Sequence, residues 1–406
     1  MPFFLILLFV GLVLIYVNVS PVAPGKKGKL IALGVLLAMF LGMYFRDTFV
    51  GSLVVAFTSV WLCQALLFYI PWGIFRVVRR MVTRRAMRAS AVMRVCRILL
   101  AVTVAMTVGL IVVGVPHNAE YWVLEKKVKL PAPSQPAGDS AQSLPAGDSS
   151  AAVDSAQSDF AATQPANFTA VFFSDIHVDP LFDRGKLERM ITDVDSIKPD
   201  YLLFGGDLAD VSMENLDEWG YDTLFRKLTA GAKVAAIAVN GNHEGMQERP
   251  GSDPGEWMRK VGFIFLDDAT VCVENACFTG RTDFQVARSR GMERRPLAEL
   301  VPKESAAGDT GVAARTKPWI LLDHQPKGIE PGYSGRLPDY ALSGHTHNGQ
   351  FFPGTIVINW VWRLAYGEGV LDGVRWLVSS GIDCWGPPVR VGSDTEMWVL
   401  RFEYGH

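Results

Sequence analysis

Residues 168–177 read FTAVFFSDIH, an apolar run that ends abruptly in an acidic residue and a histidine. The apolar run predicts a β-strand over Phe168–Phe173, and Asp175 and His177 then follow in the loop. Apolar residues at helical spacing predict a helix over Lys186–Ile197. Such alternation of short apolar runs with polar helical stretches is typical of a layered α/β domain.

The same arrangement repeats towards the C-terminus. Further strands are predicted at Tyr201–Phe204, Val234–Val239, Trp319–Leu322 and Tyr340–Leu342. Each of these strands runs directly into a loop that contains aspartate, histidine or asparagine. Because ligands bind at the carboxyl ends of the strands in an open α/β sheet, we expect these loops to converge on one crevice.

Five short motifs occupy the loops. They are Asp175-Ile-His177, Gly206-Asp207-Leu-Ala-Asp210, Gly241-Asn242-His243-Glu244, Asp323-His324 and Gly344-His345-Thr-His347. A cluster of imidazole nitrogens and carboxylate oxygens has the ligand types of a transition-metal site. Two ligands separated by one residue project to the same side of an extended chain, so such a pair can point at one centre or at two adjacent ones.

The five motifs, in this order, resemble those of the calcineurin-like metallophosphoesterase superfamily, and the resemblance covers roughly Phe168–Phe402. Residues 342–353, LSGHTHNGQFFP, together with Gly381 and residues 387–392, more narrowly resemble a bacterial membrane-associated branch of the YkuE/YaeI type. That branch usually has glycine where this chain has Asn348, and we expect a small change of loop geometry there.

The resemblance implies a layered β-sandwich flanked by helices and a site for two divalent metal ions. One ion would be held by Asp175, His177 and His347, the other by Asn242, His324 and His345, and Asp207 would bridge them. Such a pair of ions can activate a water for in-line attack at phosphorus. Oxygen and nitrogen ligands without thiolate favour manganese, with iron, zinc or magnesium as alternatives.

Two further residues receive catalytic roles from the resemblance. His243 would protonate the leaving alkoxide, which is the work of a general acid. Asp210 would orient His243 or fix the tautomer of a metal ligand, with a purely structural role as the alternative.

The first quarter of the chain is of another kind. Four long apolar runs without a charged residue precede residue 117: Phe3–Val19, Leu30–Phe45, Phe49–Phe75 and Ile98–Val115. Runs of this length predict about four transmembrane helices within residues 1–116. A cleaved signal peptide is the alternative for the first run, but no lysine or arginine precedes it and no Ala-x-Ala site follows.

Basic residues predict how these helices are oriented. Three lysines follow the first run, and eight arginines lie between Arg76 and Arg97. By the positive-inside rule both loops are cytoplasmic, so four spans place the later part of the chain outside the cytoplasm. The expected location is therefore the cell (inner) membrane, multi-pass, with an extracytoplasmic catalytic domain. One span fewer would reverse this.

Residues 117–167 are expected to form a flexible linker ahead of a catalytic domain at 168–406. Residues 131–165 are rich in Ala, Ser, Asp, Gln, Pro and Gly, a composition that cannot bury enough apolar surface to fold. Tyr121–Leu130 is expected at the bilayer surface, with Tyr121 and Trp122 as interfacial aromatic residues.

The charge balance bears on partners. With 39 Lys+Arg against 41 Asp+Glu, no global basic field indicates nucleic acid. The expected partners are the lipid bilayer and a phosphate mono- or diester, which could be lipid-linked or part of the cell envelope. Two alternatives are a nucleotide-linked lipid pyrophosphatase, whose relatives often have arginine where His243 stands, and a non-catalytic metal-binding membrane scaffold. The oligomeric state is left open.

Two other segments carry hypotheses. Cys272 and Cys277 flank a two-residue turn and would lie opposite each other in a hairpin, either as a cross-strand disulfide or as two small buried residues. The interval Asp283–Lys317 contains Arg288, Arg290, Arg294 and Arg295. It is expected to form either a lid or headgroup-binding surface, or a solvated helix face.

Four tryptophans of the domain are expected mostly in the core, with a substrate groove or lipid contact as the alternative: Trp360, Trp362, Trp376 and Trp385.

Overall fold

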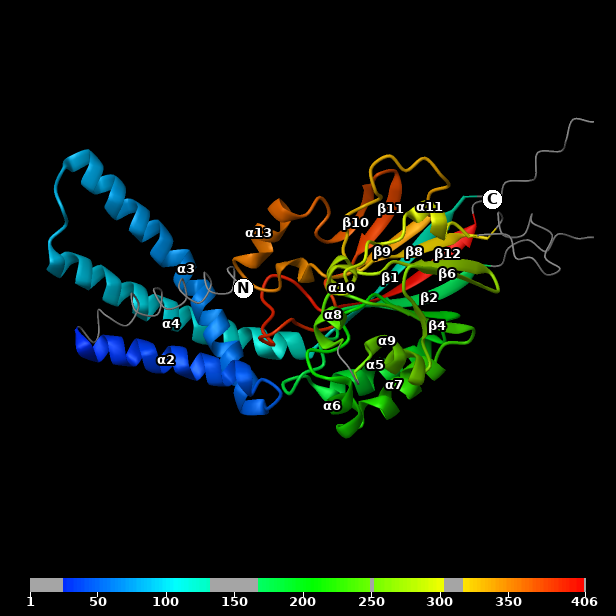
Figure 1. Cartoon of the computed structure of the whole chain (residues 1–406), viewed down its shortest axis with the longest axis horizontal. Coiled ribbons are helices and arrows are strands. Elements are labelled where there is room, and N and C mark those ends of the chain that lie inside the picture. Colours follow the sequence, from blue (N-terminus) through cyan, green and yellow to red (C-terminus); the bar gives the residue numbers. More distant parts are fainter. Residues whose placement is uncertain (1–24, 132–166, 249–251, 303–316, 405–406) are drawn as a thin grey trace, which may run out of the picture.

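The computed structural model describes residues 25–131, 167–248, 252–302 and 317–404. It consists of three long helices that project from one side of an α/β domain (Figure 1). The first predicted span, most of the low-complexity segment and part of the arginine-rich interval lie outside the described residues.

The three long helices are α2 (Lys26–Tyr44), α3 (Phe49–Thr83) and α4 (Ala89–Ala119). Within the described residues, these are the helices long and apolar enough to cross a membrane. They contain the second, third and fourth predicted runs. At 1.5 Å per residue, the 35 residues of α3 extend about 50 Å, well beyond an apolar core of about 30 Å. Helix α3 is therefore longer than a single crossing of a bilayer requires.

The α/β domain contains two six-stranded sheets. The first sheet has the order β1 (Trp122–Leu130), β12 (Glu396–Tyr404), β2 (Phe168–Phe173), β3 (Tyr201–Phe204), β4 (Ala235–Val239) and β5 (Ile264–Leu266). The second has the order β10 (Gly367–Leu371), β11 (Val374–Val378), β9 (Tyr340–Ser343), β8 (Trp319–Leu322), β7 (Ala276–Gly280) and β6 (Ala269–Val273). Strands β2, β3, β4 and β5 run parallel, as do β7, β8, β9 and β11.

Alternation along β2 shows how the layers form. Ala170 and Phe172 join the core between the two sheets, whereas Val171 and Phe173 join a second core beneath the helices. Because successive side chains of a strand point to opposite faces, a strand that is covered on both faces must be apolar throughout. The domain is therefore a β-sandwich with helices on its outer faces, which confirms the predicted fold class.

The remaining helices are short. They are α5 (Arg184–Ile197), α6 (Met213–Glu218), α7 (Tyr221–Ala230), α8 (Glu244–Gln247), α9 (Pro254–Lys260), α10 (Phe284–Ser289), α11 (Leu297–Leu300), α13 (Gly354–Val361) and the 3₁₀ turn η1 (His347–Gly349). Apolar residues of α5, α7 and α9, including Leu187, Phe225 and Trp257, pack against the first sheet.

The linker expected over residues 117–167 does not include residues 117–130, which belong to the end of α4 and to the α/β domain. Residues 122–130 form β1, which pairs in parallel with β12 along its whole length. Val128 and Leu130 are buried in the core between the sheets, and the hydroxyl of Tyr121 hydrogen-bonds Asp193 of α5. An edge strand of this kind is difficult to recognise because only one face needs apolar residues, and the other carries lysines.

The hairpin predicted around the two cysteines is present. Cys272 and Cys277 are partners in the β6–β7 register and are joined by a disulfide. Glu274 occupies the turn with a positive φ of 44°.

Three arginines of the interval after Asp283 form ion pairs with acidic residues of the domain. Arg290 pairs with Glu248 and Asp267, Arg294 with Asp323, and Arg295 with Glu299. Because these arginines are paired with carboxylates of the domain, the interval is less suited to binding anionic headgroups.

The burial of Val128 in β1 leads to a prediction. Val128→Ala should lower the free energy of unfolding of the domain by about 2 kcal/mol, because it leaves a cavity beside β12. The matched control is Val123→Ala, since Val123 lies on the same strand and is 43% exposed. Urea unfolding of the full chain in detergent, followed by near-UV circular dichroism, measures both. Equal midpoints for the two variants would show that β1 is not part of the core.

Candidate metal centre

The five motifs meet at one end of the sandwich, where β2, β3, β4, β8 and β9 end. Strand ends from both sheets contribute, the first three from one sheet and the last two from the other. Parallel strands place their carboxyl ends on the same edge, so loops distant in sequence become neighbours.

Asp175, His177 and His347 form the first group of potential ligands. The two histidine Nε2 atoms are 3.1 Å apart, and Nε2 of His347 is 3.4 Å from Oδ1 of Asp175. All three residues are buried. Nδ1 of His347 lies 3.2 Å from the carbonyl oxygen of Asp383. Nη2 of Arg390 also lies 3.4 Å from that nitrogen, and Nε2 is the ring nitrogen that faces the group.

Asn242, His324 and His345 form the second group. Oδ1 of Asn242 lies 3.2 Å from Nε2 of His324 and 2.6 Å from Nδ1 of His345. Nδ1 of His324 is 2.8 Å from the carbonyl oxygen of Gly205, so its Nε2 is the free nitrogen. This is the set that the sequence proposed for a second ion.

Asp207 lies between the two groups. Its Oδ2 is 3.5 Å from Nε2 of His177 and 3.1 Å from Nε2 of His324. Its other oxygen accepts a hydrogen bond of 2.8 Å from the backbone N–H of His243. One carboxylate oxygen therefore faces both groups of potential ligands.

The backbone at these positions is unusual. Asp175, His177, Asp207, His345 and His347 all have a positive φ, between 48° and 71°. Residues other than glycine rarely adopt this left-handed conformation, and such strain tends to cluster at functional sites.

Two neighbouring residues explain the tight turns. A Cβ at Gly344 would lie 2.1 Å from Oδ2 of Asp175, so only glycine fits there. Asn348, which replaces the glycine usual in the resembling branch, takes a φ of 48°, a conformation that asparagine tolerates. The side chain of His347 keeps its place in the first group.

His243 and Asp210 lie beside the first group. Nδ1 of His243 hydrogen-bonds Oδ1 of Asp210, and the same oxygen is 3.2 Å from Nδ1 of His177. Both alternatives proposed for Asp210 are therefore compatible with its position, because it contacts His243 and a potential ligand together.

Charge and burial set the pKa values in the site. Burial would raise the pKa of Asp210, but the imidazoles of His177 and His243 hold it well below its usual value. Burial lowers the pKa of His345 to about 3, and it lowers that of His347 well below its usual value. These two imidazoles are neutral near pH 7 and so are available as ligands.

The donor set fits divalent transition metals. Three groups of His, Asp or Glu residues have potential ligand atoms within 4.8 Å of one another, and two of them are Asp175/His177/His347 and Asp207/His324/His345. Within the described residues, all three groups lie in this one site.

Comparison with known proteins agrees with this geometry. Residues 168–349 match the family model described as calcineurin-like phosphoesterase. This part of the chain is similar to calcineurin-like phosphoesterases. An uncharacterized metallophosphoesterase of Helicobacter pylori is 28% identical over 233 residues, which are 57% of this chain and 58% of that protein.

Other relatives include both bacterial and animal proteins. An uncharacterized metallophosphoesterase of Aquifex aeolicus is 28% identical, over 57% of this chain and 83% of its own length. A zebrafish (Danio rerio) protein named "transmembrane protein with metallophosphoesterase domain" is 28% identical over 56% of this chain and 51% of its own length. The chain thus spans little more than half the length of several curated relatives that it matches.

Glu244 has a role in this site that the sequence did not reveal. Its buried carboxylate accepts backbone N–H hydrogen bonds from Asp207, Leu208 and Gly241, at 3.1, 2.6 and 2.5 Å. It therefore fixes the loop of the central aspartate against the loop of Asn242. Its place directly after His243 was the only signal in the sequence.

Arg390 and Asp383 support the first group from behind. The guanidinium of Arg390 is fully buried and donates to the carbonyl oxygens of His347 and Asp383, at 3.1 and 2.7 Å. The carboxylate of Asp383 pairs with buried Lys186 at 2.9 Å and accepts from Asn118 of α4 at 2.6 Å. The last described membrane helix thus reaches residues that orient a potential ligand.

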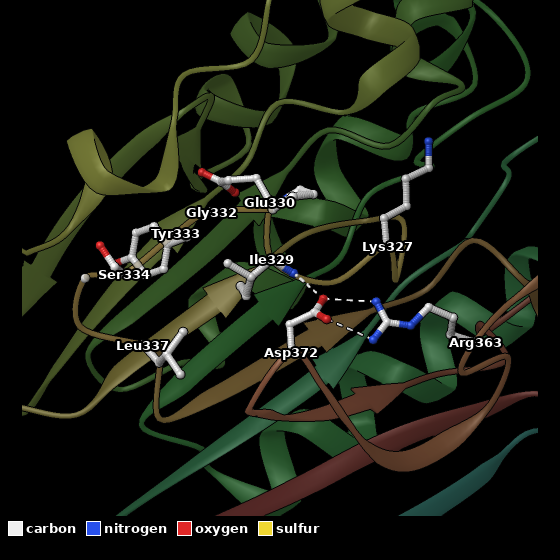
Figure 2. A pocket seen from close by; sticks show the side chains of 11 residues that line it. Lys327, Ile329, Glu330, Gly332, Tyr333, Ser334, Leu337, Arg363 and Asp372 are labelled. Atoms are coloured by element: carbon white, nitrogen blue, oxygen red, sulfur yellow. Dashed lines mark hydrogen bonds and ion pairs between the residues drawn. The ribbon is translucent and has the colours of Figure 1, made fainter.

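A separate hollow of about 560 Å³ lies on the surface of the second sheet. Figure 2 shows that Arg363 and Asp372 face each other in it, and their ion pair measures 2.9 Å. None of the residues that line it is among the predicted ligands. We do not assign it a part in the chemistry.

The hydrogen bonds by which Glu244 holds the Asp207 loop, here called the Glu244 clamp, can be tested through metal affinity. Glu244→Ala frees three buried N–H groups and loosens the Asp207 loop, so metal affinity should fall by about 10- to 100-fold, as for other residues that support ligands. Isothermal titration calorimetry of the metal-free full chain with Mn²⁺ measures the change in metal affinity. The control is Glu248→Ala, which removes a carboxylate from the same segment that pairs with Arg290. An unchanged affinity in Glu244→Ala would show that the clamp does not support the site.

Proposed function

We propose that this protein is a membrane-anchored, binuclear metal-dependent phosphoesterase that hydrolyses phosphate mono- or diesters. The observation that supports this most is the position of Asp207, with one oxygen facing His177 of the first group and His324 of the second. Asp175, His177 and His347 would hold one ion, and Asn242, His324 and His345 the other. Two ions bound there would supply an activated water and neutralise the charge that develops on the phosphoryl oxygens.

The protein itself supplies the general acid. His243 is largely buried at the rim of the first group, and its Nδ1 bonds Asp210. That bond directs Nε2 away from the carboxylate and stabilises the protonated imidazole, which can then give its proton to the leaving alkoxide. This pairing favours a hydrolase over the scaffold, since a scaffold needs neither residue.

The membrane helices restrict the substrates that the site meets. The described chain holds three helices that could cross a bilayer, directly ahead of the domain. We infer that phosphoesters of lipids or of the cell envelope are the natural substrates, and that manganese is the preferred ion, with iron, zinc or magnesium as alternatives.

The two ends of α4 support an extracytoplasmic orientation of the domain. The arginine-rich turn between α3 and α4 lies at the end of the bundle far from the catalytic domain (Figure 1). If that turn is cytoplasmic, the domain lies on the other side of the membrane. This argument does not depend on the first apolar run.

The activity is tested with the full chain in detergent and Mn²⁺, on chromogenic phosphodiesters and monoesters. His243→Ala should lower kcat by about 10²- to 10⁴-fold while metal stays bound, because only the general acid is lost. Asp207→Asn should abolish metal-dependent turnover. Asp195→Asn on the exposed surface of α5 is the control. A folded, metal-loaded wild type without turnover on either ester would favour the scaffold.

The orientation is tested with a reporter that is active only outside the cytoplasm, such as alkaline phosphatase fused after residue 404. The fusion should be active, and the same reporter fused after Arg84, in the arginine-rich turn, should be inactive. The reverse pattern would place the catalytic domain in the cytoplasm.

A further inference from the structure

Helix α13, Gly354–Val361, exposes an apolar surface. Its sequence is GTIVINWV, and none of its eight residues is buried. Four large apolar side chains are exposed: Ile356 by 49%, Val357 by 44%, Trp360 by 81% and Val361 by 66%. The helix has no charged residue. Large exposed apolar side chains gathered on one short helix are typical of a surface that contacts a protein partner, a ligand or a membrane.

This surface lies at the rim of the metal centre. Helix α13 follows η1, which begins with His347, and the two pack tightly: a Cβ at Gly349 would lie 2.3 Å from the carbonyl carbon of Gly354. Trp362, just after the helix, has its ring 5.2 Å from that of His345. Trp385, which is 57% exposed, has its ring 6.4 Å from that of His243.

Segments near this surface are hydrogen-bonded to two of the long helices. In Figure 1, α13 lies on the side of the domain that faces the helical bundle. Gln64 of α3 is fully buried and donates a hydrogen bond of 3.2 Å to the carbonyl oxygen of Phe352, two residues before α13. The carbonyl oxygen of Gly114 in α4 accepts from the backbone N–H of Arg390 at 3.1 Å. The rim of the site is thus joined to two helices that would be embedded in lipid.

We propose that α13, together with Trp385, inserts into the lipid headgroup region and brings the phosphoester group of a membrane lipid to the metal centre. Tryptophan is suited to this depth because its ring is apolar and its N–H is polar. An apolar helix in the interface gains binding energy from the area that it buries in lipid. This proposal rests on the phosphoesterase activity proposed above, and it specifies the substrate class as lipid headgroup phosphoesters.

Two chromogenic esters that differ only in acyl length separate the two proposals. One is the para-nitrophenyl phosphodiester of a long-chain diacylglycerol, incorporated in phosphatidylcholine vesicles that contain the full chain. The other is its dibutyryl counterpart, which stays in solution. Turnover of the soluble ester tests the phosphoesterase, and the ratio of vesicle to soluble turnover tests the role of α13.

The variant is Trp360→Ser with Val361→Ser, and the matched control is Val370→Ser, a valine of β10 that is also 66% exposed. The ratio should fall by about tenfold in the double variant and stay unchanged in the control, because only α13 loses apolar area that contacts lipid. An unchanged ratio, or an equal loss on both esters, would overturn the proposal.

A second measurement does not require turnover. Brominated phosphatidylcholine quenches tryptophans at the membrane surface, so the wild type should be quenched more than Trp360→Phe in the same vesicles. Equal quenching would overturn the insertion of α13. A second contrary outcome is that α13 contacts another copy of the chain. Cross-linked dimers that form in the wild type and are lost in Val361→Ser would show this.

Discussion

The structure depends on burying several carboxylates and imidazoles together. Asp175, Asp207, His177 and His324 have almost no exposed surface, and uncompensated charges in such a place are costly. Each group therefore has fixed partners: Asp175 accepts from the backbone of His345, Asp207 from that of His243. Backbone N–H groups from separate loops thus balance the negative charge, and metal ions would complete the balance.

This constraint explains why the site is formed by loops from two sheets. A single sheet edge provides the loops after β2, β3 and β4, and the second sheet adds those after β8 and β9. The core between the sheets, with residues such as Phe172 and Ile320, sets the distance across which the two halves of the site face each other. Packing far from the metal centre thus determines its geometry.

The strands that lead into the five motifs could be predicted from the sequence because they are apolar on both faces. The predicted bounds of β2, β3 and β8 agree with the structure, and the five motifs identify the loops that meet. Strand β1 escaped prediction because its pairing with β12 joins residues more than 270 positions apart and buries only one face. Glu244 and Arg390 escaped because their partners are backbone groups of other loops, which no local pattern encodes.

The position of β1 changes what the low-complexity segment connects. Only Glu120 and Tyr121 separate α4 from β1, and the segment lies between β1 and β2, after the first strand of the domain. A protease that cut within this segment would divide the chain into two covalent pieces. The pieces would still share nine residues of parallel pairing between β1 and β12. The α/β domain would then stay attached to the long helices as a non-covalent complex, and its covalent separation from them requires a cut ahead of β1.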